Sequence, residues 1–234
     1  MENKKTIIGI IIVVILIIAL IVLSYLYNNF NKTQLNLLTD ETNSILQTDI
    51  LTEGINSEIK TQRNYAIVEK SIKEYLLKLK NIYSSIEEIN NTINPNDIFS
   101  ATNMEDETFS TIDAIISDYR EKGESSLTKY RELIKEENIL NNIKDKNISP
   151  RTDYYIDLYN TVMLSDVMKE KYTKIENEIQ RKKDELNYKL DKLEDVKKFL
   201  DENQRYWSIK DGKIQFSNVN KMTEYYNLLN KIED

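Results

Sequence analysis

Residues 64–93 read NYAIVEKSIKEYLLKLKNIYSSIEEINNTI, and the spacing of their apolar side chains decides the fold. Apolar residues recur at steps that alternate between three and four, the spacing of an α-helix that buries one seam. The members of this seam are Tyr65, Val68, Ile72, Tyr75, Leu79, Ile82, Ile86, Ile89 and Ile93. Asn94 and Pro95 follow, and proline cannot continue a helix. The sequence therefore predicts one amphipathic helix that ends near Ile93.

Two further amphipathic helices are predicted on the C-terminal side. The first covers residues 109–140, where Gly123 interrupts the pattern without ending the helix. A connector at residues 144–150 leads to the second, which runs from Tyr154 to about Gln204. At 1.5 Å per residue this last helix would be about 75 Å long.

Long helices with short connectors fold back as antiparallel neighbours, because an isolated amphipathic helix cannot bury its apolar stripe. Residues 28–204 are therefore predicted to form an elongated antiparallel bundle of three or four helices. The fold class is all-α. A coiled coil between two copies of the chain would bury the same seams, and the sequence does not separate these two arrangements.

On the N-terminal side, no charged residue occurs from Thr6 to Asn31, and residues 7–23 are almost wholly Ile, Val and Leu. A helix needs about 20 apolar residues to cross a bilayer. We therefore predict a transmembrane helix that acts as a signal anchor at residues 6–27, preceded by a short segment at residues 1–5. The membrane-anchoring residues are predicted to include Ile7, Ile11, Ile15, Leu20, Leu23, Tyr25 and Tyr27.

The flanks of this run favour a cytoplasmic N-terminus and an extracytoplasmic C-terminal part in a cell membrane. Lys4 and Lys5 precede the run, and positive residues beside a span resist translocation. Tyr25 and Tyr27 suit the opposite interface, where the ring is half buried and the hydroxyl stays hydrated. The competing interpretation is a signal peptide cleaved after Ser24, but the run is longer than the 7–15 apolar residues usual for one.

The C-terminal residues 205–234 follow a different pattern. Asp211 and Gly212 lie between two short alternating segments, which is the strongest short signal for a β-hairpin. A short helix is predicted after it, with Ser217 or Asn218 as its N-cap. A lone hairpin is marginal in water, so the hairpin and the short helix are expected to pack on the bundle.

The composition excludes several classes of function. The chain has 234 residues, no His, no Cys and a net charge of −7. An acidic protein repels phosphate backbones, so nucleic-acid binding is not expected. The commonest general base, the thiol nucleophile and the main transition-metal ligands are missing, and no phosphate-binding or dinucleotide-binding fingerprint occurs. We therefore expect no catalytic residues, no cofactor and no metal. The Lys-, Asn- and Ile-rich composition indicates a bacterial source.

Aromatic residues are the candidate contacts for a partner or a ligand. Tyr154, Tyr155 and Tyr159 cluster in the sequence, and the last two are four residues apart on one helix face. Trp207 and Phe216 belong to the predicted hairpin. Such rings can form an interaction hot spot or line a pocket. The alternative is that the tyrosines fill the rim of a narrow bundle and that the hairpin caps its end.

These features favour a membrane-anchored structural or interaction protein, a scaffold or adaptor. Its expected partners are the lipid bilayer and another protein, or a second copy joined through the helical seams. The alternative is a sensory or solute-recognition bundle that binds a small molecule and signals through a partner membrane protein. An envelope enzyme that uses paired carboxylates alone, such as Glu87 and Glu88, is a third and weaker possibility.

In general layout, residues 32–204 resemble the extracytoplasmic four-helix bundles of bacterial chemoreceptors and sensor kinases. The resemblance implies a ligand-binding bundle outside the cytoplasm. It is architectural only, and no specific motif supports it. The chain also departs from those receptors, because it has neither their second membrane span nor their cytoplasmic signalling region.

Overall fold

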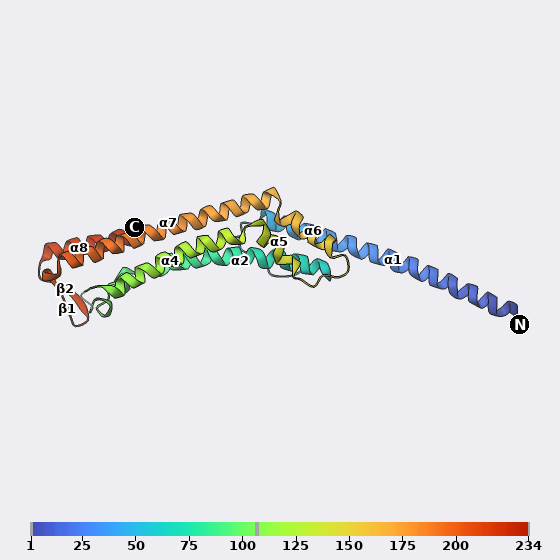
Figure 1. Cartoon of the computed structure of the whole chain (residues 1–234), viewed down its shortest axis with the longest axis horizontal. Coiled ribbons are helices and arrows are strands. Elements are labelled where there is room, and N and C mark those ends of the chain that lie inside the picture. The colour runs from blue at the N-terminus through green and yellow to red at the C-terminus, as the bar shows by residue number, and fades with distance from the viewer. Residues whose placement is uncertain (1, 106–107, 234) are drawn as a thin grey trace. The chain divides into compact units, whose positions relative to one another are not determined.

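The computed structural model describes the backbone of residues 2–105 and 108–233 and the side chains of residues 14–105 and 108–232. Within them the chain is all-α with one small β-hairpin, so the predicted fold class is confirmed (Figure 1). The elements are α1 (Glu2–Gln47), α2 (Asn64–Thr92), α3 (Pro95–Ile98), η1 (Thr102–Met104), α4 (Ser110–Leu133), α5 (Glu136–Lys144), α6 (Thr152–Met163), α7 (Asp166–Glu202), η2 (Gln204–Tyr206), β1 (Trp207–Lys210), β2 (Lys213–Phe216) and α8 (Val219–Glu233).

The chain forms two compact units. Unit 1 comprises Met1–Tyr75 and Leu140–Ser165, and unit 2 comprises Leu76–Ile139 and Asp166–Asp234. Unit 1 therefore contains α1, the first part of α2 and α6. Unit 2 contains the rest of α2 together with α4, α7, the hairpin and α8.

The predicted seam helix is present as α2. Its first seam residues, Tyr65, Val68 and Ile72, are at most 2% exposed. The helix ends at Thr92, and Asn94 then caps the short α3 by accepting a hydrogen bond from the backbone N–H of Asn96. The seam helix therefore ends before the proline, as predicted, and Pro95 in addition begins the short helix α3.

The two other long helices were predicted wrongly, since each is divided. The segment expected as one helix from Tyr154 to Gln204 consists of α6 and α7, separated at Leu164 and Ser165. The segment expected over residues 109–140 consists of α4 and α5. Gly123 lies inside α4 and does not end it. An added Cβ at this position would lie 2.9 Å from Leu186 Cδ2, so the glycine lets α4 approach α7 closely.

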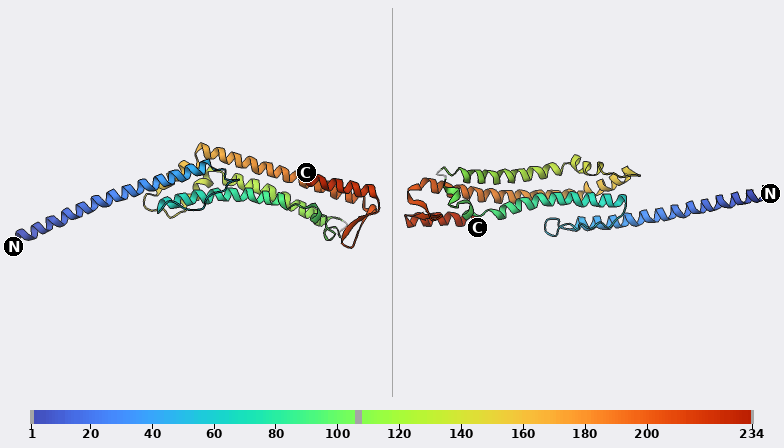
Figure 2. Two further views of the ribbon diagram at one scale, coloured as in Figure 1. Left: turned by 180° about the vertical axis from the view of Figure 1, so that it is seen from behind. Right: turned by 90° about the horizontal axis from the view of Figure 1, so that it is seen from below.

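Unit 2 is a helical bundle in which α7 packs against α4 and α8 (Figure 2). Ion pairs of Arg120 with Asp191 and of Arg131 with Glu176 show that α4 and α7 run antiparallel. The hairpin pairs Trp207 with Phe216, and its apolar side chains pack against the core of the unit. Fully buried members of this core include Ile112, Leu186, Leu190, Leu193, Val196 and Leu200.

Unit 1 packs the second half of α1 against the start of α2, the loop between them and α6. Its buried apolar side chains include Leu38, Ile45, Ile50, Tyr65, Val68, Ile72, Tyr155, Tyr159 and Met163. Helix α1 ends at Gln47, and Gly54 lies in the following loop with a positive φ of 83°.

Candidate functional site

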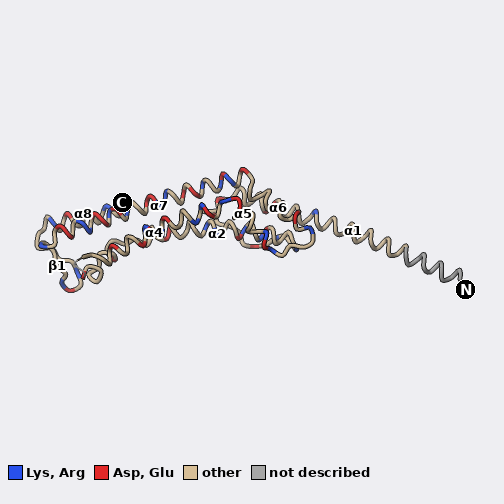
Figure 3. The backbone as a smooth tube through the Cα atoms, in the orientation of Figure 1, with Lys and Arg blue, Asp and Glu red and all other residues tan. Residues whose placement is uncertain are grey.

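The first half of α1 is apolar and exposed. Large side chains from Val14 to Tyr27 lie on the surface, and Leu20 and Tyr25 are 66% and 70% exposed. Figure 3 shows no charged residue in the described part of this stretch before Lys32. Within the described residues, α1 is the one helix that is long and apolar enough to cross a membrane.

The predicted anchoring residues fall on this stretch. Ile15, Leu20, Leu23, Tyr25 and Tyr27 are all exposed. Ile7 and Ile11 are part of the α1 backbone, and their side chains lie outside the described residues. A run of exposed apolar side chains of this length is unfavourable in water and favourable in a bilayer.

The second half of the same helix is packed into unit 1. Gln34, Leu38, Glu41, Thr42 and Ile45 are at most 6% exposed and recur at helical spacing on one face. No break separates the exposed half from the packed half, because α1 is continuous from Glu2 to Gln47. At 1.5 Å per residue the whole helix is about 70 Å long.

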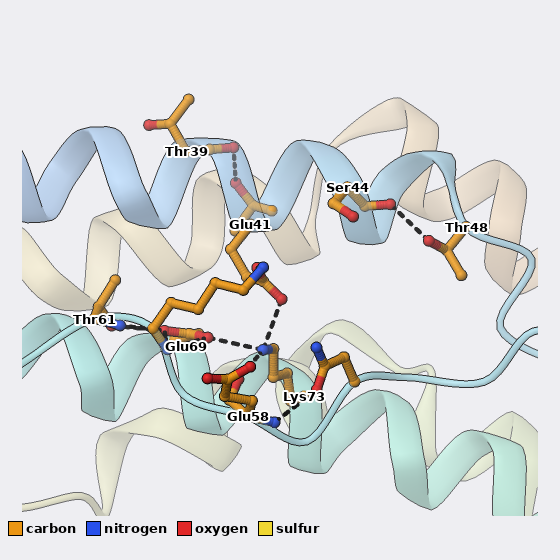
Figure 4. A network of polar contacts seen from close by, with 11 residues as sticks. Thr39, Glu41, Ser44, Thr48, Glu58, Thr61, Glu69 and Lys73 are labelled. Carbon is orange, nitrogen blue, oxygen red and sulfur yellow. Dashed lines mark hydrogen bonds and ion pairs between the residues drawn. The ribbon is translucent and has the colours of Figure 1, made fainter.

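A network of charged groups, three of them buried and the fourth, Lys60, 46% exposed, joins α1, the loop and α2 (Figure 4). The carboxylate of Glu41 on α1 lies 2.7 Å from Lys73 Nζ and 2.5 Å from Lys60 Nζ. The carboxylate of Glu69 on α2 lies 2.8 Å from the same Lys73 Nζ. The two carboxylates and two ammonium groups balance in charge. The residues Glu41, Lys60, Glu69 and Lys73 are called the polar joint below.

Hydrogen bonds satisfy both of the most deeply buried members of the polar joint. Lys73 Nζ donates to Glu69 and, over 2.5 Å, to the carbonyl oxygen of Glu58, and it also forms an ion pair with Glu41. Glu69 is fully buried and also accepts from the backbone N–H groups of Lys60 and Thr61 and from the Thr61 hydroxyl. A buried charge is tolerated only when it is paired in this way.

The polar joint also shifts the ionisation of its carboxyl groups. Burial by itself raises the pKa of Glu69, but the hydrogen bonds from Lys73, Thr61 and the backbone outweigh it and hold the pKa below the ordinary value of 4.5. Burial likewise opposes ionisation of Glu41, and its bonds to Lys60 and Lys73 again leave its pKa lowered. Both carboxylates are therefore charged at neutral pH.

Unit 1 is expected to lose stability in acid. A carboxyl with a lowered folded-state pKa adds stability that is present above the unfolded value of 4.5 and lost as the pH falls through the folded value. Thermal unfolding of the full chain in a neutral detergent, followed by circular dichroism at stepped pH, should give a midpoint that drops below about pH 4.5. Glu69→Gln should be less stable at pH 7 and should depend less on pH. An identical pH profile for both proteins would contradict this role.

Two of the three candidate tyrosines of α6 are buried. Tyr155 and Tyr159 are 5% and 0% exposed, so both face the interior of unit 1. The Tyr65 ring packs edge-on against Tyr155 with centroids 5.0 Å apart, and Tyr154 packs against Tyr155 at 5.1 Å. The Tyr159 hydroxyl accepts a hydrogen bond from Asn142 Nδ2. Burial raises the pKa of the Tyr159 hydroxyl, so this group stays protonated.

The two aromatic residues of the hairpin are half-buried in unit 2. Trp207 donates from Nε1 to the carbonyl oxygen of Leu200 over 2.8 Å, and its ring lies 6.1 Å from that of Phe109. The Phe216 ring lies 5.2 Å from Tyr225 of α8. The hairpin residues therefore belong to unit 2, whereas the tyrosines of α6 belong to unit 1.

The polar joint was not predicted from the sequence. Its four residues are of the types that usually occupy a solvated helix face, and α1, the loop and α2 meet only in the folded unit. One signal was present, because Glu69 and Lys73 are four apart and each adjoins a seam residue, Val68 or Ile72. Among the described residues, no group of three or more Asp and Glu side chains is placed to hold a metal ion.

Neither a protein-family model, nor a curated protein, nor a solved structure matches the chain. Its function is therefore inferred from its own residues.

Proposed function

We propose that this chain is a single-pass membrane protein whose helical units act as a scaffold or adaptor for another protein. The observation that carries this proposal is the continuity of α1, which is apolar and exposed in its first half and packed into unit 1 in its second. A helix that crosses the bilayer and then enters a folded unit without a hinge holds that unit in a defined orientation.

The proposed topology places the N-terminus in the cytoplasm and residues 28–234 outside it. Lys4 and Lys5 precede the span, and the first positive residue after it is Lys32. The positive-inside bias is counted over such short flanks. The acidic remainder of the chain has no bearing on this orientation, because Asp and Glu contribute little to it.

The polar joint supports a mechanical role for the anchor. It links α1 to the loop and to α2, and breaking a buried ion pair by removing one partner costs about 3–5 kcal/mol. The membrane-proximal part of α1 therefore does not swing independently of unit 1. Movement or tilt of the span would be passed directly to the start of α2.

The proposed docking surface for the partner is an apolar stripe on α8. Val219, Met222 and Tyr226 are 71%, 38% and 51% exposed, and their spacing of three and four places them on one face of the helix. The rest of the same apolar face, with Leu229 and Tyr225 next to Met222, is buried in unit 2. An amphipathic helix that leaves one edge of its apolar face exposed can lie with that edge in a groove of another protein.

Site-specific photo-crosslinking in intact membranes tests the scaffold proposal. A photoreactive amino acid at Met222 should give a discrete adduct with a second protein or a second copy. The same amino acid at Glu224, which is exposed on a different face of α8, is the matched control and should give much less. If the chain stays monomeric and unlinked at both positions, it does not act as a scaffold through α8.

A flexible insertion in α1 is expected to leave the chain anchored in the membrane but to remove the fixed orientation of unit 1. Four residues, Gly-Ser-Gly-Ser, inserted after Asn31 should interrupt α1, because glycine and serine are poor helix formers. Carbonate-resistant membrane association should be unchanged, since the apolar run stays intact, while the Met222 adduct should decrease at least twofold. An unchanged adduct would mean that the span is only a tether.

A ligand-binding sensory role is the second candidate, and one hollow in unit 2 favours it. This hollow has a volume of about 380 Å³, within the range of small-molecule sites, and it is lined in part by Tyr119, Lys122 and Lys129 of α4 and by Glu88 of α2. A small molecule bound there would raise the unfolding midpoint of the full chain. A midpoint that no compound of a metabolite library shifts would leave the scaffold role alone.

A further inference from the structure

The two arginines of unit 1 have no carboxylate partner among the described residues, whereas three of the four arginines of unit 2 have one. Arg120, Arg131 and Arg181 of unit 2 each form an ion pair with Asp or Glu. Arg63 and Arg151 are exposed, and no ion pair joins either of them to the residues that the structure describes. The chain has 26 Lys and six Arg, so the choice of arginine at both positions is notable.

Each of these two guanidinium groups lies over an aromatic ring instead. The Arg63 Cζ is 4.7 Å from the centroid of the Phe30 ring, and the Arg151 Cζ is 4.5 Å from that of Tyr154. Stacking fixes the plane of a guanidinium and leaves its N–H donors free at the edge. The free N–H donors of a positively charged guanidinium can form two parallel hydrogen bonds to the oxygens of a negatively charged phosphate group.

The two arginines lie on the same part of unit 1. Arg63 directly precedes α2, and Arg151 directly precedes α6. The side chain of Asn64 joins the two segments, because its Nδ2 donates to the carbonyl oxygens of Ser149 and Pro150 over 3.2 Å each. The Tyr65 and Tyr154 rings also pack edge-on across the same junction, with centroids 6.5 Å apart.

Because α1 is continuous, the level of Arg63 relative to the bilayer can be estimated from the end of the span. The headgroup region adds about 5–7 Å on each side of the hydrocarbon core, which corresponds to about three to five helical residues. If the span ends at Tyr27, residues 28–32 cross the headgroup region, and Phe30 lies at its middle. Arg63 stacks on Phe30 and is therefore at the level of the lipid phosphates.

We propose that Arg63 and Arg151 bind the phosphate groups of phospholipids beside the span. The inference rests on the proposed membrane anchoring and adds a lipid ligand to it. Asp153, which is exposed, is the acidic residue closest in sequence to either arginine, so the two arginines leave a net positive charge in these segments of a chain that is otherwise acidic. Phospholipid contact would fix the rotation of unit 1 about α1.

Solvent shielding in vesicles tests this proposal. The chain has no Cys, so Gln62→Cys places one fluorophore beside Arg63. The full chain is reconstituted in vesicles of phosphatidylcholine and phosphatidylglycerol, and acrylamide, a neutral quencher, reports the accessibility of the fluorophore. The double variant Arg63→Gln/Arg151→Gln should raise the quenching constant at least twofold, because the surface no longer holds the headgroups.

The matched control removes two positive charges from unit 2 instead of from unit 1. Arg205 also stacks on a ring, with its Cζ 4.6 Å from Tyr206, and Lys198 is exposed. Arg205→Gln/Lys198→Gln should leave the quenching constant unchanged. Circular dichroism should show equal helix content in all of the variants.

A change of lipid tests the proposal without any arginine substitution. In vesicles of diglucosyldiacylglycerol, which has no phosphate, the parent protein should be as accessible as the double variant, and added inorganic phosphate should not restore its shielding. Equal shielding in both lipids, or restoration by free phosphate, would overturn the assignment to lipid. Carbonate extraction of the same vesicles separates the two proposals: a protein that is released refutes the span, and one that is retained but unshielded refutes only the phosphate contact.

Discussion

Replacing Lys73 by alanine is expected to destabilise unit 1 by about 3–5 kcal/mol, the cost of leaving a buried charge without its partner. The carboxylates of Glu41 and Glu69 would both lose their shared ammonium group, and Glu69 is fully buried. The carbonyl oxygen of Glu58 would lose its hydrogen bond as well. The effect is large because the cation is removed while the two carboxylates that it neutralises stay in place.

Hydrogen exchange of the full chain in detergent micelles, read by mass spectrometry, measures this effect locally. Peptides from residues 34–47 and 64–75 should exchange about two to three orders of magnitude faster in Lys73→Ala, since 1.4 kcal/mol is a factor of ten. Lys70→Ala is the matched control on the same helix. Lys70 pairs with Glu74 at the same spacing, but the pair is exposed, and such pairs contribute about 0–1 kcal/mol. Equal exchange in the two variants would show that the polar joint does not hold α1.

Three arginines in the middle of the span are expected to abolish membrane integration. Each costs about 2.5–3.5 kcal/mol at the centre of a membrane helix, while each Ile, Val or Leu contributes about −0.3 to −0.6 kcal/mol. With Ile15, Ile17 and Ile18 replaced, the twelve Ile, Val and Leu that remain between Ile7 and Leu23 no longer outweigh the charges. The protein resistant to carbonate extraction should fall from nearly all to a minor fraction.

The control for this experiment replaces the same three residues by alanine. Alanine keeps the helix and adds no charge, so the triple alanine variant should stay integrated. If the triple arginine variant also resists extraction, the apolar half of α1 is not what holds the chain in the membrane.

The helical segments could be predicted from the spacing of apolar residues. The break between α4 and α5 and the break between α6 and α7 could also have been found, from the angular positions of the apolar residues around one continuous helix. A straight helix turns about 100° per residue, so Tyr159 and Tyr172 would lie on nearly opposite faces of one helix. Both are nevertheless buried, because they belong to two separate helices: α6 ends at Met163 and α7 begins at Asp166. In the same way, Tyr130 and Ile139 would lie on opposite faces of one continuous helix. Both are buried, because they belong to separate helices, α4 and α5.

The candidate site was predicted in part. The apolar half of α1 follows from composition alone, because a bilayer selects for length and hydrophobicity without any tertiary contact. The polar joint does not follow from the sequence, since Glu41, Lys60 and Lys73 are far apart in it and meet only when the loop folds back. Tyr154, Tyr155 and Tyr159 are close together in the sequence, but only the fold shows that Tyr155 and Tyr159 are buried inside unit 1.

Cysteine scanning of α1 tests most directly whether one unbroken helix both crosses the bilayer and enters unit 1. The chain has no Cys, so single cysteines can be placed at each position from residue 14 to residue 47 and treated with a membrane-impermeant maleimide in intact membranes. We predict no labelling from residue 14 to residue 27. Beyond residue 30, labelling should follow a helical period, with exposed positions such as Thr33, Asn36 and Asp40 reactive and buried positions such as Gln34 and Leu38 protected. Labelling within residues 14–27, or uniform labelling from residue 28 to residue 40, would contradict this account.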